Sequence, residues 1–326
     1  MQYEAPNRTD RKHLSMMQLM DMFPNEEAAT QWFESIVWPT GQRCCGKCGS
    51  ERTRKVPNAK PMPYWCTDCR SYFSVRTGTP IARSNVPLRK WAIAIYLCLT
   101  SLKSVASNKL QNDIDVSQPT AWFMLHRIRE AWAHEPPNNK WQGPVEADET
   151  YFGGKRENMP ASKRKMLTGR GTVGKTIVAG AKDRPSKQVR AKVVARADTP
   201  TLSGLVQSVT QVGADVFTDD FPAYNMLGAV YKHRSIKHGA GQYVDGPVHT
   251  NGIESFWSML KRAHKGTFHK LSPKHLNRYI QEFVAKQNMR DSDTLVQMRD
   301  TVARLVGRNL LYRDLIADNG LSNASR

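Results

Sequence analysis

The sequence is poor in acidic residues and in long apolar runs, and both deficits narrow the classes of protein that it can encode. Asp and Glu number 29 against 48 Lys and Arg, which gives a formal net charge of +19 in 326 residues. The longest apolar run, 91–100, falls short of the about 18 residues that a membrane-spanning helix needs. Residues 1–14 lack the apolar core of a signal peptide. We therefore expect a soluble, intracellular protein with no membrane partner, and the positive charge favours a polyanion such as nucleic acid.

Cysteine is also scarce, with six residues in the chain, and a disulfide framework would be unusual at this length. Four of them, Cys45, Cys48, Cys66 and Cys69, form two C-x2-C pairs with residues 49–65 between them. Two such pairs can place four thiolates around one structural Zn²⁺ and leave no position for a catalytic water. We expect a zinc ribbon at 41–82 in a reducing compartment. Cys44 is an alternative to Cys45, although it gives the wrong spacing for its pair.

The first 140 residues show the periodicity of helices outside the cysteine region. An N-terminal helical segment is expected at 1–40. Within 83–140, the segments 104–112 and 117–132 are predicted to form a helix-turn-helix, in which Ser117 caps the second helix. The polar face of that helix carries Arg127 and Arg129, and such a helix can lie in the major groove of DNA. A three-helix packing unit without a DNA role is the alternative.

From residue 144 the pattern changes to strands that alternate with helices. Strands are predicted at 145–152, 176–181, 189–195, 214–219 and 235–238. A basic, glycine-rich stretch, 155–175, has too few apolar residues to pack a core and is predicted to be a loop. Its cations, Lys155 and Arg156 among them, suit a phosphate backbone, while a merely solvated loop is the alternative.

The stretch 248–265 has the pattern of an amphipathic helix with a marked apolar stripe. The stripe consists of Ile253, Phe256, Trp257 and Leu260. Glu254 and Lys261 lie about two helical turns apart, at the border of this stripe. A carboxylate and an ammonium are therefore expected at the edge of whatever the helix packs against. For these two residues alone, a surface charge pair on an ordinary helix is the simpler interpretation.

Three carboxylates stand out because of where they fall in the predicted elements. Asp148 lies inside an apolar strand, Asp219 ends another strand, and Glu254 is on the amphipathic helix. Ligand sites of open sheets lie at such strand ends, and acids gathered in one place need a cation. Mg²⁺ or Mn²⁺, as two ions about 3.5–4 Å apart, would suit phosphate chemistry. Three unrelated structural acids are the alternative.

Taken together, these stretches resemble insertion-sequence transposases of the DDE class, in the ISXO2-like branch. The matching motifs are CCGKCGS with YWCTDC, AWFMLHRIREAW, ADETYFGGK, FTDDFPAY, and VHTNGIESFWSMLKR with GTFHKLS and RYIQEF. The resemblance implies a multidomain α+β protein with N-terminal helices, a zinc ribbon and a helix-turn-helix. An α/β ribonuclease H-like mixed-sheet catalytic domain follows at 141–290, and a helical tail at 291–326.

The resemblance also implies roles for individual residues. Asp148, Asp219 and Glu254 would be the catalytic acids, holding two Mg²⁺ or Mn²⁺ ions. Lys261 would contact transposon-end DNA, with Arg262 beside it. Two alternatives stay open at this point. Asp220 neighbours Asp219, and some relatives use Asn as the third ligand, which makes Asn251 a lesser candidate unless it caps the helix.

The function that the resemblance implies is that of a DNA transposase. It would hydrolyse phosphodiesters at the transposon ends and transfer the 3′-hydroxyl into target DNA. Its partners would be double-stranded terminal inverted repeats and target DNA, and it would act as a homodimer or larger synaptic complex. The expected location is the cytoplasm of a bacterial cell, at the nucleoid when bound to DNA. The alternatives are a non-catalytic DNA-binding regulator derived from a transposase, and a ribonuclease H-like nuclease or junction resolvase.

Overall fold

The computed structural model describes residues 11–133, 140–154, 157, 159–166, 172–236 and 248–317, without the side chain of Lys163. The chain forms two compact units. The sheet unit is the described part of Glu135–Arg290, and the ribbon unit is the described part of Asn7–His134 with Asp291–Asn319. These units are coarser than the five predicted domains, whose boundaries stay a prediction. None of the helices in the described part of the chain has the length and apolar character needed to span a bilayer.

The ribbon unit is mostly helical. Its helices are α1 (Met16–Met22), α2 (Glu26–Val37), α3 (Leu88–Thr100), α4 (Ser107–Ile114), α5 (Gln118–Glu130), α10 (Thr294–Ala303) and α11 (Tyr312–Ile316). Helix α3 is buried along most of its length and contacts α2, α4, α5 and α10. In the helical tail predicted at 291–326, α10 ends at Ala303, and the chain then turns through Gly307 at a φ of +77°. The C-terminal segment thus completes the core of the N-terminal helices.

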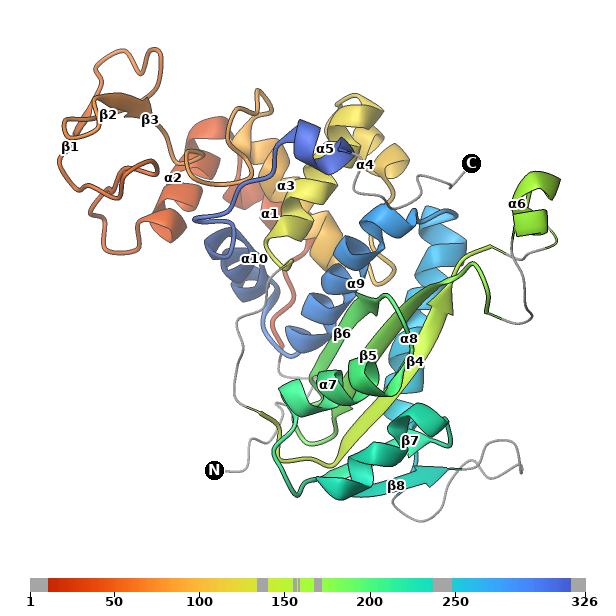
Figure 1. The fold of residues 1–326 in the computed structure, drawn as a ribbon. Coiled ribbons are helices and arrows are strands. Elements are labelled where there is room, and N and C mark those ends of the chain that lie inside the picture. The colour runs from red at the N-terminus through yellow and green to blue at the C-terminus, as the bar shows by residue number, and fades with distance from the viewer. Residues whose placement is uncertain are drawn as a thin grey trace. The chain divides into compact units, whose positions relative to one another are not determined.

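The predicted zinc ribbon is a small antiparallel sheet in the ribbon unit. Its strands are β1 (Thr53–Lys55), β2 (Tyr64–Cys66) and β3 (Ser71–Phe73), in the order β1-β2-β3 (Figure 1). The rings of Trp38, Tyr64 and Phe73 pack edge to face or tilted on one another beside it. These aromatic contacts give the short strands the apolar support that three-residue ladders alone do not provide.

The helix-turn-helix is present as α4 and α5, with Asp115 in the left-handed region at the turn. Ser117 caps α5, since its hydroxyl accepts the backbone N–H of Thr120 at 3.4 Å. The expected exposure of Arg127 and Arg129 is wrong, because their relative exposures are only 8% and 1%. The Arg127 guanidinium lies 4.0 Å from the ring centre of Phe123, one turn back on the same helix. A buried guanidinium cannot reach a phosphate without rearrangement.

The sheet unit contains a mixed five-stranded sheet in the order β6-β5-β4-β7-β8 (Figure 1). Its strands are β4 (Val145–Phe152), β5 (Thr176–Asp183), β6 (Val189–Val194), β7 (Asp215–Asp219) and β8 (Lys232–Ile236). Strand β5 runs antiparallel to β4 and to β6, whereas β4, β7 and β8 run parallel to one another. This mixed sheet is typical of the ribonuclease H-like fold, as predicted.

Helices cover both faces of this sheet. On one face lie α7 (Thr199–Val209) and the 3₁₀ helix η2 (Pro222–Ala229), packed on side chains such as Ala179 and Ala181 of β5. On the other lie α8 (Asn251–Ala263) and α9 (Pro273–Asn288), packed on side chains such as Val178, the residue before Ala179. A π-helical turn, η4 (His264–Phe268), continues α8. The alternation follows from the pleat of a strand, in which successive side chains point to opposite faces.

The basic stretch 155–175 is only partly described. Within it, α6 (Ala161–Met166) is a short helix, where a loop was predicted throughout. Its apolar residue Met166 is 83% exposed, so this helix buries no core, in keeping with the composition that led to the loop prediction. Lys155 and Arg156 lie outside the described residues.

Candidate active site

The candidate site lies where two parallel strands separate. Strands β4 and β7 pair only at Val145 with Val216 and at Glu146 with Phe217. Asp148 and Asp219 each lie two residues beyond the last of these pairs. Parallel strands that separate at their carboxyl ends leave an opening there, which is the usual place for a ligand in open α/β sheets. The register of the sheet therefore brings together two acids that are far apart in the sequence.

Asp148 is oriented by two hydrogen bonds. Its Oδ1 accepts the backbone N–H of Glu149 at 2.8 Å, and its Oδ2 accepts the indole N–H of Trp257 at 3.0 Å. The indole has room because Gly180 is the cross-strand partner of Asp148. A Cβ at Gly180 would lie 2.7 Å from Trp257 Cη2, a distance that real side chains do not adopt. Trp257 thus packs in the core, as predicted, and also fixes the first acid, which its place in the apolar stripe did not indicate.

Three carboxylates converge at this opening, and one of them was not predicted. Asp148, Glu149 and Asp219 each offer an oxygen, and these oxygens all lie within 4.8 Å of one another. The exposed Asp220 is not part of this group, which favours Asp219 as the second acid. Glu149 was overlooked because neighbouring residues of a strand normally face opposite sides. The signal that could have found it is a second acid directly after Asp148 in an otherwise apolar run.

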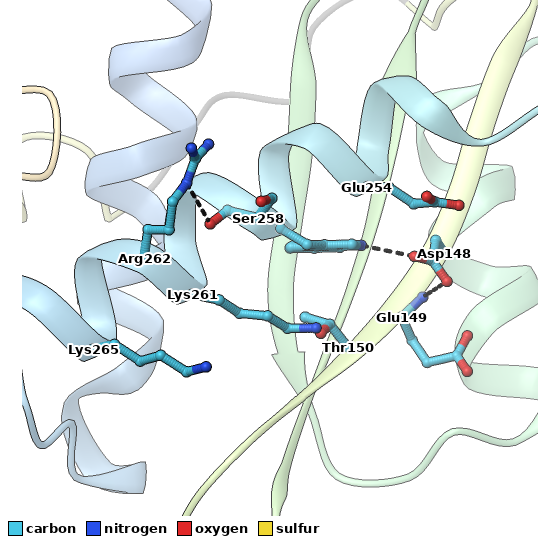
Figure 2. A pocket seen from close by; sticks show the side chains of 9 residues that line it. Asp148, Glu149, Thr150, Glu254, Ser258, Lys261, Arg262 and Lys265 are labelled. Carbon is cyan, nitrogen blue, oxygen red and sulfur yellow. Dashed lines mark hydrogen bonds between the residues drawn. The ribbon is translucent and has the colours of Figure 1, made fainter.

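Glu254 faces the same pocket from α8 but is held differently. Its Oε1 accepts the hydroxyl of Thr250 at 2.6 Å, and in the described chain it is not among the three grouped carboxylates. Its charge nevertheless contributes to raising the pKa of Asp148, so the two side chains are electrostatically coupled. Figure 2 shows Glu254 on its helix above Asp148 and Glu149 on the neighbouring strand. All three predicted acids therefore gather around one opening.

The electrostatics of the site disfavour full ionisation of the acids. Burial raises the pKa of Asp148 to about 7, and the negative charges of Asp219 and Glu149 add to the effect. Burial also raises the pKa of Glu149 to about 7, with the charge of Asp219 as the second cause. Acids in this state are suited to a divalent cation, because a cation compensates the repulsion that otherwise favours the protonated forms.

Tyr224 of η2 holds Glu149 from the other face of the sheet. Its hydroxyl donates to Glu149 Oε2 at 3.0 Å, and the side chain is 1% exposed. Burial raises the pKa of Tyr224 well above its ordinary value, with the charge of Glu149 as the second cause. The phenol therefore stays protonated and keeps donating to the carboxylate.

The start of α8 is fixed by a buried acid that the sequence did not single out. Glu146, two residues before Asp148 on β4, is 1% exposed and accepts the backbone N–H of Ile253 at 2.8 Å. Its other oxygen accepts Arg184 Nε at 2.7 Å. Gly252 is needed for this approach, since a Cβ there would lie 2.6 Å from Glu146 Oε2. Because Thr250 makes no capping bond with its side chain, Glu146 supplies the cap from the sheet.

One further expectation around α8 is resolved by this arrangement. The cap residue is Thr250, so the suggestion that Asn251 caps the helix is wrong; Asn251 is the exposed first residue of α8. His249 belongs to the Glu146 network, where its Nδ1 lies 2.9 Å from Arg184 Nη2 and its carbonyl accepts the same group at 2.6 Å. His249 therefore helps to anchor the helix start.

Basic side chains line the same pocket as the acids (Figure 2). The lining residues are Asp148, Glu149, Thr150, Glu254, Trp257, Ser258, Lys261, Arg262 and Lys265. In Figure 2, Lys261 and Lys265 extend to the same side, with the ammonium of Lys261 beside Thr150. Arg262 is directed away and its Nε donates to the carbonyl of Ser258 at 3.3 Å. Ammonium groups next to a carboxylate cluster are suited to a phosphate that approaches bound cations.

The four predicted zinc ligands form a second candidate metal site, in the ribbon unit. One sulfur from each of Cys45, Cys48, Cys66 and Cys69 lies within 4.8 Å of the others. The Cys45–Cys69 and Cys48–Cys66 sulfur pairs are 3.7 and 3.6 Å apart. Tetrahedral zinc with Zn–S bonds of about 2.3 Å has S···S edges of about 3.8 Å, so the cluster fits the ion.

The surroundings favour the thiolate at Cys66, whereas burial raises the pKa of the Cys69 thiol to about 12. The backbone N–H groups of Cys69 and Asp68 lower the pKa of the Cys66 thiol to about 7, and the N–H of Lys47 donates to Cys45 Sγ at 3.4 Å. Cys44 is not in the sulfur cluster of the described chain, and its carbonyl accepts the indole N–H of Trp38. The spacing argument for Cys45 is thereby confirmed.

The sheet order and the acids at the separated ends of β4 and β7 define a ribonuclease H-like protein. Residues 140–288 match the ISXO2-like transposase domain. Over 281 residues the chain is 31% identical to a protein of Halobacterium salinarum described as an uncharacterized protein in transposable element ISH50. That similarity covers 82% of this chain and 92% of the relative. The chain belongs to the ISXO2-like, or IS1595, transposase family and carries a DDE transposase domain. The relative is archaeal, which gives no support to the expectation of a bacterial cell.

Proposed function

We propose that the protein is a DNA transposase that cleaves phosphodiesters at the ends of its element and transfers the new 3′-hydroxyl into target DNA. The observation that carries the proposal is the carboxylate cluster of Asp148, Glu149 and Asp219. Asp148 and Glu149 of this cluster line a pocket that basic side chains also line. Carboxylates serve phosphate chemistry when divalent cations join them to the substrate. The membership of the DDE transposase family points to DNA as that substrate.

The residues present fit a divalent metal. Carboxylate oxygens within 4.8 Å of one another, with two pKa values raised to about 7, form a hard and mutually repelling donor set. Asp148, Asp219 and Glu254 would hold two Mg²⁺ or Mn²⁺ ions. When bound, such ions activate the attacking oxygen and stabilise the leaving one.

The chain's own side chains would then orient the metal-binding carboxylates and neutralise the phosphates of the DNA. Trp257 fixes the Asp148 carboxylate through its indole N–H. Lys261 and Arg262, which line the pocket, would bind phosphates of the transposon end. Lys155 and Arg156 belong to the same proposal through their place in the basic stretch. Arg127 and Arg129 are not among the proposed DNA contacts, since both are buried.

End recognition would fall to the ribbon unit. The zinc ribbon would hold one structural Zn²⁺ on its four cysteines. In the helix-turn-helix the accessible part of α5 is its N-terminal turn, with Gln118 and Thr120 partly exposed. The first residues of a recognition helix are the ones that contact base edges in known complexes. Because two ends must be joined, we expect a homodimer or larger assembly on terminal repeats and target DNA.

The test is a strand-transfer assay with the element's own terminal repeats, Mg²⁺ and a target plasmid. Wild type should yield cleaved and joined products. Asp148→Asn, Asp219→Asn and Glu254→Gln should each bind the repeats and yield neither product. Asp220→Asn, the exposed neighbouring acid, is the matched control and should behave as wild type.

Three results would overturn this proposal or part of it. A variant that cuts at the normal rate removes its residue from the catalytic set. Repeat binding by the wild type without any cleavage would identify the runner-up, a DNA-binding regulator derived from a transposase. Cleavage without joining would point to a nuclease or junction resolvase instead.

A further inference from the structure

We propose that Glu149 is a fourth metal-binding carboxylate, which completes with Asp148 and Asp219 the ligand set of one of the two ions. The proposal rests on the proposed function for the presence of a divalent metal. The family resemblance implied only Asp148, Asp219 and Glu254. The oxygens that the structure brings within 4.8 Å belong instead to Asp148, Glu149 and Asp219.

Asp148 and Glu149 are consecutive residues of β4, and the pairing of this strand explains how they can share one site. Side chains of neighbouring strand residues point to opposite faces of a sheet. Here β4 remains paired with β5 as far as Phe152, but its pairing with β7 ends at Glu146. Beyond that point no strand of the described residues lies beside one edge of β4. Asp148 from one face and Glu149 from the other can both bend around this edge toward Asp219.

Glu149 is held in place by a hydrogen bond from Tyr224. Tyr224 comes from the face of the sheet opposite α8 and donates its hydroxyl to Glu149 Oε2. Carboxylates that bind metals are commonly held by such a hydrogen bond, which fixes the direction of their lone pairs. Tyr224 itself is buried in the core beneath η2, so the bond is made from a rigid position. Glu149 also lines the pocket that the basic residues share.

Glu254 is held differently from the three grouped acids. One oxygen of Glu254 accepts the hydroxyl of Thr250, and the described structure does not group this residue with the other three acids. Its charge still acts on Asp148. We infer a division in which Asp148 is shared, Glu149 and Asp219 serve one ion, and Glu254 serves the other. Four carboxylates provide for two ions better than three, because each ion needs several oxygen ligands.

The experiment is a titration of the metal-free full chain with Mn²⁺ in the absence of DNA. Binding is measured by calorimetry and by the electron paramagnetic resonance signal of free Mn²⁺. Glu149→Gln is the main variant, because its side-chain oxygen can still accept the Tyr224 hydroxyl. It should weaken the tighter Mn²⁺ site about tenfold or more, as Asp148→Asn should. Asp220→Asn is the matched control and should bind as wild type.

A shorter acid separates a ligand from a mere source of charge. Glu149→Asp keeps the charge but draws the carboxylate back by one methylene, so a ligand role requires that it also weakens Mn²⁺ binding. Wild-type affinity in both Glu149→Gln and Glu149→Asp, with loss in Asp148→Asn, would overturn the proposal for Glu149 alone. Unchanged binding in Asp148→Asn as well would instead overturn the metal site of the proposed function.

Discussion

At the scale of single residues, Asp148 is the side chain on which most contacts of the site depend. It receives the indole N–H of Trp257, lies beside Gly180, and is coupled to three other acids. Its position in an apolar strand made it a candidate from the sequence, and the family resemblance then implied its role as the first acid. The roles of Trp257 and Glu149 were not predictable in the same way. Both depend on the register of β4 against β5 and β7, which no local pattern records.

Removal of the indole N–H should therefore impair the site more than the fold. Trp257→Phe keeps an aromatic ring over Gly180 but leaves Asp148 Oδ2 without this donor. We expect Mn²⁺ affinity and strand cleavage to fall about tenfold, the lower end of the effect known for groups that orient metal ligands. Trp141→Phe, a buried indole in the core on the other face, is the control. Equal losses in the two variants would show a general packing effect.

The raised pKa values of the acids make a second prediction at this scale. The pKa of Asp148 is about 7 in the folded protein, against an ordinary 3.8, so the folded state binds its proton more tightly than the unfolded chain. The stability that this provides is present below about pH 4 and is lost as the pH rises through about 7. Its upper bound is about 4 kcal/mol.

Asp148→Asn, which cannot ionise, should avoid this loss. In metal-free protein, its thermal midpoint relative to wild type should rise from pH 4 to pH 8. Saturating Mn²⁺ should stabilise wild type and reduce the difference at high pH. A difference between the two proteins that stays constant with pH would contradict the assigned pKa.

At the scale of elements, α8 was the helix that the sequence predicted best, but the contacts that anchor its start were not predicted. The apolar stripe at i, i+3, i+4 and i+7 predicted the helix and its buried face because that signal is local. Glu146 contacts the helix start across 107 residues of sequence, so no pattern within α8 could reveal its cap. The loop prediction failed at α6 for a related reason. The composition indicated that this stretch buries no core, but a stretch without a core can still form a short helix. The zinc ligands were predictable because spacing alone brings them together.

Loss of the cap should therefore destabilise the sheet unit. Glu146→Ala leaves the N–H of Ile253 and the Arg184 guanidinium without their buried partner. We expect the free energy of unfolding in urea to fall by about 3 kcal/mol, as when one member of a buried pair is removed. Asp215→Ala, which breaks an exposed pair with Arg234, should cost less than about 1 kcal/mol. Similar costs for the two variants would contradict the capping role.

At the scale of the whole molecule, the formal charge of +19 is the feature that the sequence establishes without any fold. It predicts affinity for a polyanion but not where the polyanion lies. The structure adds that Lys261 and Lys265 border the acids, so that phosphates and metal ligands share one pocket. It also shows that Arg127 and Arg129 are buried and not on the predicted DNA-binding surface. The prediction failed because a helical periodicity indicates which face is polar but not what covers that face.

The contribution of one such cation can be measured through salt dependence. Lys261→Ala should reduce the slope of log affinity for terminal-repeat DNA against log salt by about 0.9, the value for one lost phosphate contact. Lys192→Ala removes an exposed lysine from β6, at the far edge of the sheet, and should leave the slope unchanged. An unaltered slope in Lys261→Ala would exclude it from the DNA interface.

The central claim is that the acids at the point where β4 and β7 separate hold divalent ions against the DNA phosphate that is cut. The most direct measurement is cleavage of a terminal repeat whose scissile phosphate carries sulfur in place of a non-bridging oxygen. Mg²⁺ binds sulfur poorly, and Mn²⁺ accepts it better because it is the softer ion. The account expects cleavage of this substrate to fail in Mg²⁺ and to return in Mn²⁺ for wild type but not for Asp148→Asn. Equal cleavage of sulfur and oxygen substrates in Mg²⁺ by wild type, for each of the two sulfur positions, would contradict it.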